Sequence, residues 1–184
     1  MADLRQIFAE KGDHGLYLYK HKHEDSLIAA AREELAKSPT GERMLKIVDV
    51  QDIEIKVVKN PEQMKFVPNG HMIYIGAPGD LKSPNPEFIL DMAQGIREAE
   101  QLLLGFAPQT DDMYSQEYSN TYHSRQVDLI IHMFKVAEEL QKSTNSQVFL
   151  DKIENYGYGD LYKLYKEDVS NEEIVDLYLS YIDQ

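Results

Sequence analysis

Four residues in this chain carry side chains that could hold a metal ion or move a proton: Asp91, Glu98, Asp128 and His132. Asp91 and Glu98 lie two turns apart on one face of a predicted helix, and Glu87 and Gln94 share that face. Carboxylate and amide oxygens are the ligands that Mg²⁺ and Ca²⁺ prefer, so this face is a candidate metal site. An ordinary solvated helix face explains the same spacing, because charged residues are abundant in so acidic a chain.

Asp128 and His132 lie one helical turn apart in a later apolar segment. At that spacing the carboxylate can orient the imidazole as a base, or both can ligate a metal, with Glu139 further along the same line. A surface ion pair is the alternative interpretation. If all four residues converge, the chemistry they support is hydrolysis assisted by a divalent metal.

The helix that positions Asp91 and Glu98 is marked at both ends. Asn85 can cap the first turn, Pro86 fits the first helical position, and Gly105 can take the left-handed conformation that ends a helix. Apolar residues recur three and four apart between these signals: Ile89, Met92, Ile96, Ala99 and Leu103. The opposite face is polar: Glu87, Asp91, Gln94, Glu98 and Gln101. An interior Gly95 costs about 1 kcal/mol relative to alanine, so we expect it to let another backbone come close.

Two stretches before this helix predict a small sheet. Residues 51–59 alternate, with Ile53, Ile55 and Val57 on one side, as in a strand with one wet face. Residues 64–67 and 71–75 flank Pro68-Asn69-Gly70, and an Asn-Gly pair favours a tight hairpin. We expect the hairpin to pair antiparallel and to pack its apolar side against the helix 86–104.

Apolar spacing and capping signals predict the remaining elements. They are a short helix near residues 4–12, a brief strand at 16–19, a helix from Asp25 or Ser26 to Lys37 that Pro39 stops, a long helix from Asp111 or Asp112 through Leu140, helices at 146–155 and 160–166, and a last helix after the capping box Ser170–Glu173. Residues 41–47 are ambiguous. His21 and His23 could trap a transition metal, adventitiously rather than in a functional site.

Tyrosine is frequent and forms two stripes at helical spacing: Tyr114, Tyr118 and Tyr122, and Tyr158, Tyr162 and Tyr165. An aromatic ring with a hydroxyl is typical of interfaces that stay partly wet. We therefore expect a protein partner, or self-association through the tyrosine-rich helices. Packing at the edge of the core is the alternative for each ring.

Composition excludes several classes of function. The chain has 19 Lys and Arg against 32 Asp and Glu, a net charge of −13 that repels nucleic acid and anionic lipid. It has no cysteine, which excludes disulfides, cysteine-ligated zinc and thiol catalysis. Its start lacks the apolar core of a signal peptide, and no run approaches the ~18 apolar residues of a membrane span. We expect a cytoplasmic protein with no cofactor.

The order of helix, three strands with a hairpin, punctuated helix and long helix resembles that of zincin-like metallopeptidases over residues 50–142. Within it, Ala93-Gln94-Gly95-Ile96-Arg97-Glu98-Ala99 is similar to the Ala-His-Glu-Leu-Arg-His-Ala of some bacterial zincin-like domains. The resemblance implies zinc ligands where Gln94 and Glu98 stand, and the catalytic glutamate where Gly95 stands. A neutral amide is a poor zinc ligand and glycine offers no base, so peptide hydrolysis by that mechanism is not expected.

The sequence thus predicts a single α+β domain over residues 1–184, with a small antiparallel or mixed sheet followed by a mainly helical C-terminal half. Our leading hypothesis is a non-catalytic binding or interaction domain, on a fold related to inactive zincin-like peptidases. The alternative is a divalent-metal-dependent hydrolase that uses Asp91, Glu98, Asp128 and His132.

Overall fold

The computed structural model describes residues 24–58, 65–67, 71–77, 83–106, 116–167 and 169–182. Several predicted features lie outside these residues: the helix near 4–12, the strand at 16–19, His21 and His23, the hairpin turn at 68–70, and the start of the long helix at Asp111 or Asp112.

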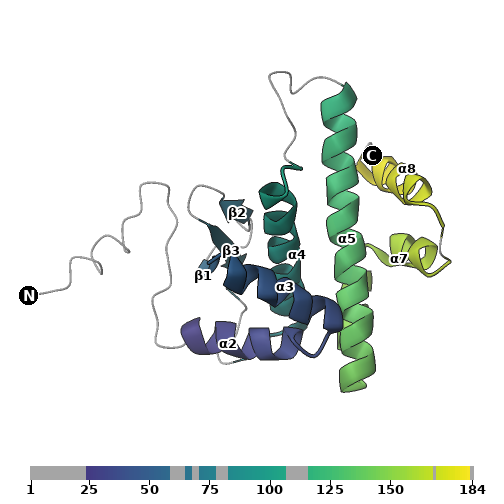
Figure 1. Cartoon of the computed structure of the whole chain (residues 1–184). Coiled ribbons are helices and arrows are strands. Elements are labelled where there is room, and N and C mark those ends of the chain that lie inside the picture. The colour runs from purple at the N-terminus through teal and green to yellow at the C-terminus, as the bar shows by residue number, and fades with distance from the viewer. Residues whose placement is uncertain are drawn as a thin grey trace, which may run out of the picture.

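The molecule is arranged around one long helix, α5 (Gln116–Thr144), which stands upright in Figure 1. On one side of α5 lie α4 (Pro86–Leu103), the sheet, α2 (Glu24–Leu35) and α3 (Pro39–Val50). On the other side lie α7 (Gly159–Lys166) and α8 (Asn171–Ile182), which follow α6 (Val148–Asn155). This is the expected α+β architecture with a mainly helical C-terminal half. None of the described helices is long and apolar enough to cross a membrane.

The sheet is small and mixed. Its strands β1 (Glu54–Val58), β2 (Lys65–Val67) and β3 (Met72–Gly76) lie in the order β1-β3-β2. β2 pairs antiparallel with β3, which confirms the hairpin, and β1 pairs parallel with β3. Ile53, Ile55 and Val57 are buried while Glu54 is exposed, as the alternating pattern predicts.

Helix α4 packs against β2 and β3 as expected. The predicted start and end signals of α4 are confirmed: the Asn85 side chain accepts a hydrogen bond of 2.8 Å from the Phe88 amide, and Gly105 has a φ of +82°. One assignment of its faces is wrong: Leu103 is 38% exposed rather than buried, because the apolar stripe drifts around the helix by its last turn. On the polar face, Gln101 is only 4% exposed, because it hydrogen-bonds to α5.

Gly95 allows a close approach, but the neighbour is a side chain rather than a backbone. A Cβ atom at this position would lie 2.7 Å from Cγ2 of Ile73 on β3. Real Cβ atoms do not come so close to another carbon, so glycine at this position lets α4 settle onto the sheet.

Pro39 does more than stop α2, because it also begins α3. Ser38 caps α3 by accepting a hydrogen bond of 2.9 Å from the Gly41 amide, and proline fits the first helical position. The ambiguous residues 41–47 are therefore helical.

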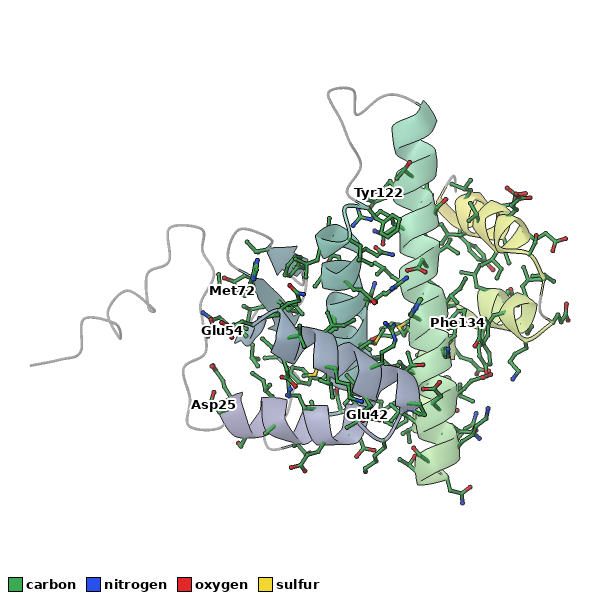
Figure 2. All side chains as sticks on the ribbon, in the orientation of Figure 1. Asp25, Glu42, Glu54, Met72, Tyr122 and Phe134 are labelled. Atoms are coloured by element: carbon green, nitrogen blue, oxygen red, sulfur yellow. The ribbon has the colours of Figure 1, made fainter. Side chains whose placement is uncertain are left out.

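The C-terminal helices pack on α5 through aromatic rings. The rings of Tyr162 and Tyr165 on α7 lie 5.3 and 5.6 Å from the ring of Phe134, which is labelled on α5 in Figure 2. The predicted capping box is confirmed, since the Glu173 amide donates to Ser170 Oγ and the Ser170 amide donates to Glu173 Oε2.

Candidate functional site

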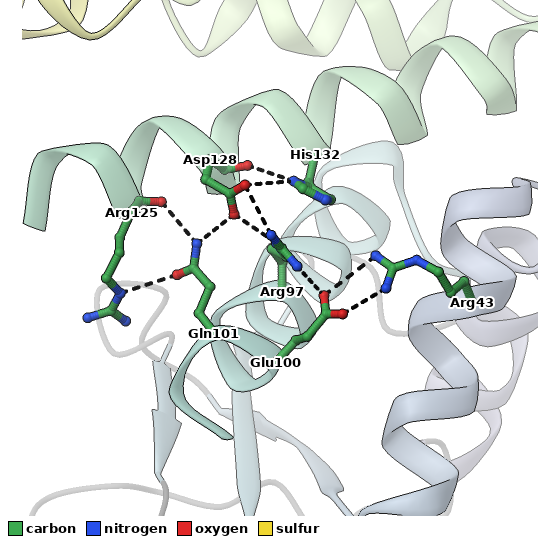
Figure 3. Close-up of polar contacts among 7 residues, drawn as sticks. All are labelled: Arg43, Arg97, Glu100, Gln101, Arg125, Asp128 and His132. Atoms are coloured by element: carbon green, nitrogen blue, oxygen red, sulfur yellow. Dashed lines mark hydrogen bonds and ion pairs between the residues drawn. The ribbon is translucent and has the colours of Figure 1, made fainter. Parts of the chain in front are cut away.

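A network of charged and polar side chains crosses the contact between α4 and α5 (Figure 3). At its centre, the Asp128 carboxylate accepts hydrogen bonds from Arg97 Nε at 2.7 Å and Arg97 Nη2 at 3.0 Å, and from Gln101 Nε2 at 2.6 Å. Burial favours the neutral acid, but the contacts with His132 and Arg97 outweigh it and hold the pKa of Asp128 well below its usual range. Asp128 is therefore ionised and fully engaged.

The network of side chains continues through Glu100 to Arg43 on α3. Arg97 Nη1 donates to Glu100, and Arg43 Nη1 donates to the same carboxylate at 2.7 Å. Burial again opposes ionisation, and the two guanidinium groups nevertheless lower the pKa of Glu100. All three side-chain nitrogens of Arg97 are thus used inside the network, which ties α3, α4 and α5 together.

Asp128 and His132, predicted as neighbours, do lie together. His132 Nδ1 is 2.9 Å from the Asp128 carbonyl oxygen and 3.4 Å from the carboxylate Oδ1. The carboxylate of Asp128 serves three partners at once, since it also binds Arg97 and Gln101. Its ion pair with Arg97 makes Asp128 a weak base and a weak metal ligand, because the guanidinium neutralises the carboxylate.

Asp91 and Glu98 have separate partners. Tyr156 donates its hydroxyl to Asp91 at 3.0 Å, and burial raises the pKa of Asp91 to about 6 against that hydrogen bond. Glu98 accepts the Phe66 amide at 3.1 Å and so joins α4 to β2. In the part of the chain that the structure describes, no three His, Asp or Glu side chains come together as a metal-binding group, so the four candidate ligands do not form one cluster.

Glu139, further along the same line of α5, has a structural partner. Its carboxylate accepts hydrogen bonds from Ser38 Oγ at 2.5 Å, from the Thr40 amide at 2.8 Å and from Thr40 Oγ1 at 2.9 Å. These donors belong to the beginning of α3, so Glu139 places a negative charge at a helix N-terminus.

Two hollows flank α5. The α4–α5 hollow, of about 410 Å³, is lined by Arg97, Gln101, Phe106, Thr121, Ser124, Arg125 and Asp128. The α5–α8 hollow, of about 720 Å³, is lined by His123, Ser124, Val127, Asp128, Ile131, His132, Glu172, Val175, Asp176 and Leu179. Ser124 and Asp128 border both hollows, so one stretch of α5 forms a wall of each.

The residues that sequence reasoning missed belong to these hollows. Arg125 was not singled out, and neither were Glu172 and Asp176 on α8. The four-residue spacing of Glu172 and Asp176 was visible in the sequence, as was that of Val175 and Leu179. What was not visible is which helix faces them.

Comparisons with known proteins give no relative: no family model matches the chain, and no significant match is found among curated proteins or solved structures.

Proposed function

We propose that this chain is a non-catalytic binding domain, and that its α5–α8 hollow receives a basic amphipathic helix of a protein partner. The observation that carries the proposal is the composition of that hollow, where two helices face each other with apolar side chains between them. The acidic side chains that α8 adds to it form no ion pair with a described residue.

Both walls of the hollow contain apolar side chains. Val127 and Ile131 lie four residues apart on α5, and Val175 and Leu179 lie four residues apart on α8. Residues four apart stack along one helix face, so each pair adds an apolar strip to one wall of the hollow. A groove of this kind suits the apolar face of a third helix.

The negative charge of α8 favours a positively charged partner. Glu172 and Asp176 line the hollow, and neither forms an ion pair with any described residue. Residues 171–182 contain no lysine or arginine, and the whole chain carries a net charge of −13. Lysine or arginine side chains on a partner would find uncompensated negative charge here.

The engagement of the other carboxylates supports binding over catalysis. Asp128 and Glu100 are held by arginines, and Glu138 accepts from Lys166 at 2.6 Å and from Tyr162 at 2.8 Å. A general base or a metal ligand needs a lone pair that is free for the reaction. The metal-dependent hydrolase thus lacks a converged set of ligands in the described residues.

The second tyrosine stripe gives less support to self-association than its sequence spacing did. Tyr158, Tyr162 and Tyr165 are partly buried against the core of their own chain. We therefore assign the partner surface to the α5–α8 hollow, and a second copy of the chain is an outcome that the experiment below can reveal. The cytoplasm remains our proposed compartment, on the sequence grounds given above.

The proposal is tested by titrating the protein with a synthetic helix of about 18 residues built from leucine and lysine, in which leucine occupies one face. We expect saturable one-to-one binding by calorimetry, and no binding of the matching leucine–glutamate peptide. Oligomers seen by light scattering in the absence of peptide would point to a second copy of the chain as the occupant and would reject the basic partner.

Two double variants separate the hollow from general electrostatic attraction. Glu172→Gln with Asp176→Asn neutralises the hollow, while Asp151→Asn with Glu154→Gln removes the same charge from α6, where both residues are exposed. The first variant should weaken binding about tenfold, since two exposed charges contribute roughly 0.5–1 kcal/mol each, and the second should have little effect. Equal weakening by both variants would show that the peptide merely follows the net charge.

We also propose that the fold descends from zincin-like peptidases that lost their chemistry. The support is the order of elements, with a hairpin-containing sheet before α4, and the position of Gln94 and Glu98 one turn apart on the half-buried side of that helix. This ancestry is compatible with a non-catalytic binding domain.

A further inference from the structure

We infer that the α4–α5 hollow is a second binding site, which takes an organic carboxylate with an apolar group and holds the carboxylate on Arg125. This site is independent of the helix-binding hollow, although both share the same stretch of α5. The inference rests on three features of the hollow: a fixed guanidinium, its lack of an acidic partner among the described residues, and the neighbours that surround it.

Arg125 is held in place by a single buried residue. Its Nε donates to Gln101 Oε1 at 3.3 Å, and Gln101 Nε2 donates back to the Arg125 carbonyl oxygen at 3.3 Å. Gln101 is itself fixed, because the same Nε2 donates to Asp128 at 2.6 Å. A guanidinium oriented before the ligand arrives loses little conformational entropy on binding.

The terminal nitrogens of Arg125 have no acidic partner among the residues that the structure describes. Figure 3 shows them pointing away from the network, whereas every side-chain nitrogen of Arg97 lies within it. Among the described residues, no carboxylate forms an ion pair with Arg125. A preorganised arginine that no described carboxylate binds can receive the carboxylate of an external ligand.

The remaining lining defines the rest of the ligand. Thr121 and Ser124 supply hydroxyl groups on the same helix, and Phe106, which is 58% exposed, supplies an aromatic ring directly after α4. The planar fork of arginine matches the two oxygens of a carboxylate, and the ring gives an apolar group a place to pack. A phosphate dianion fits less well, because the Asp128 carboxylate lines the same hollow and the whole chain is negative.

The test uses 3-phenylpropanoate as the probe and follows binding by two-dimensional NMR of the full chain. We expect saturable shifts at Thr121, Ser124 and Arg125, and at least about tenfold weaker binding of the neutral 3-phenylpropanamide. N-acetyl-phenylalanine with a free or an amidated carboxyl group then tells whether a peptide terminus is accepted as well as a free acid. Equal binding of acid and amide, or no saturable binding at all, overturns the inference.

Three variants and one control assign the effect to the geometry of Arg125. Arg125→Gln should weaken binding about tenfold, while Lys135→Gln, which removes the same charge from an exposed position on α5, should not change it. Arg125→Lys keeps the charge without the fork and should fall between them. Gln101→Met keeps the charge but releases Arg125, so it should also weaken binding. If Arg125→Gln and Lys135→Gln behave alike, the hollow does not bind carboxylates through Arg125.

Discussion

At the scale of single residues, two aspartates beside α4 have opposite environments: Asp91 lies on α4 itself, and Asp128 lies on α5 and contacts α4. Asp128 meets the guanidinium of Arg97, which favours the ionised form and lowers its pKa. Asp91 accepts a hydrogen bond from the neutral hydroxyl of Tyr156 in a half-buried position, and burial raises its pKa to about 6 although Lys152 lies nearby. The neighbour, rather than the residue type, therefore decides whether a carboxylate stabilises the fold at neutral pH.

Replacing Asp91 should reveal this difference as a pH dependence of stability. Because the folded-state pKa of about 6 exceeds the ordinary 3.8, the stability from protonated Asp91 is complete below pH 3.8 and is lost as the pH rises through 6. Asparagine does not ionise, so the Asp91→Asn variant does not lose stability as the pH rises. We expect its free energy of unfolding at neutral pH to exceed that of the natural protein by up to about 3 kcal/mol. Urea unfolding of both proteins at several pH values measures the difference. A difference that does not change between acidic and neutral pH would show that Asp91 ionises freely.

At the scale of the elements, Glu139 shows how α5 supports the beginning of α3. Burial disfavours its charge, but the donors from Ser38 and Thr40 outweigh this and lower the pKa of Glu139. With a lowered folded-state pKa, its contribution to stability is present above the ordinary value of 4.5 and is lost as the pH falls below it.

Glu139→Gln should therefore reduce the free energy of unfolding by about 1–2 kcal/mol at neutral pH, and by less in acid. Glu154→Gln on α6 is the control, because Glu154 is exposed and should have almost no effect. Thermal unfolding monitored by circular dichroism compares the two variants. If Glu139→Gln is as harmless as Glu154→Gln, the contact between α5 and α3 does not stabilise the fold.

The proposed zincin-like ancestry is also tested on one element, by giving α4 two histidines at positions 94 and 98. Gly95 is left unchanged, since a larger side chain there would collide with Ile73. We expect Gln94→His with Glu98→His to bind zinc at least about tenfold more tightly than the natural protein, with a third ligand from α5.

His132→Ala and Asp128→Ala identify that third ligand by calorimetric zinc titration of the double variant. His132 is the better candidate, because Arg97 and Gln101 already occupy the Asp128 carboxylate. Weak zinc binding that neither alanine replacement alters would mark α4 as an ordinary core helix and remove the argument for this ancestry.

The sequence was sufficient for elements whose signals are local. Asn85, Pro86 and Gly105 correctly marked α4, and alternation marked β1, because each signal reports on its own neighbours. Helix α3 was missed although Met44, Leu45 and Val48 follow a helical spacing, since Pro39 was interpreted only as a stop signal. The network of Arg43, Arg97 and Asp128 could not be predicted, because it joins three helices whose mutual placement is set by packing.

At the scale of the whole molecule, α5 divides the protein into two parts (Figure 1). A hollow lies on each side of this helix. On the side toward α4, an ion-pair network joins the helices, and Arg125 is held in the hollow beside this network. On the side toward α8, the hollow has apolar strips and acidic side chains that form no ion pair with a described residue. This distribution favours two different ligands, a carboxylate on one side and a basic helix on the other. We propose that a protein partner docks in the second of these hollows, between α5 and α8.

The most direct test of that claim is to map the bound leucine–lysine helix by cross-saturation NMR, which marks the protein groups that touch the peptide. We predict that the signals most strongly affected are the methyl groups of Val127, Ile131, Val175 and Leu179, from both walls of the α5–α8 hollow. Saturation confined to other surfaces, such as α2 or α6, with these four residues unaffected, would contradict the account.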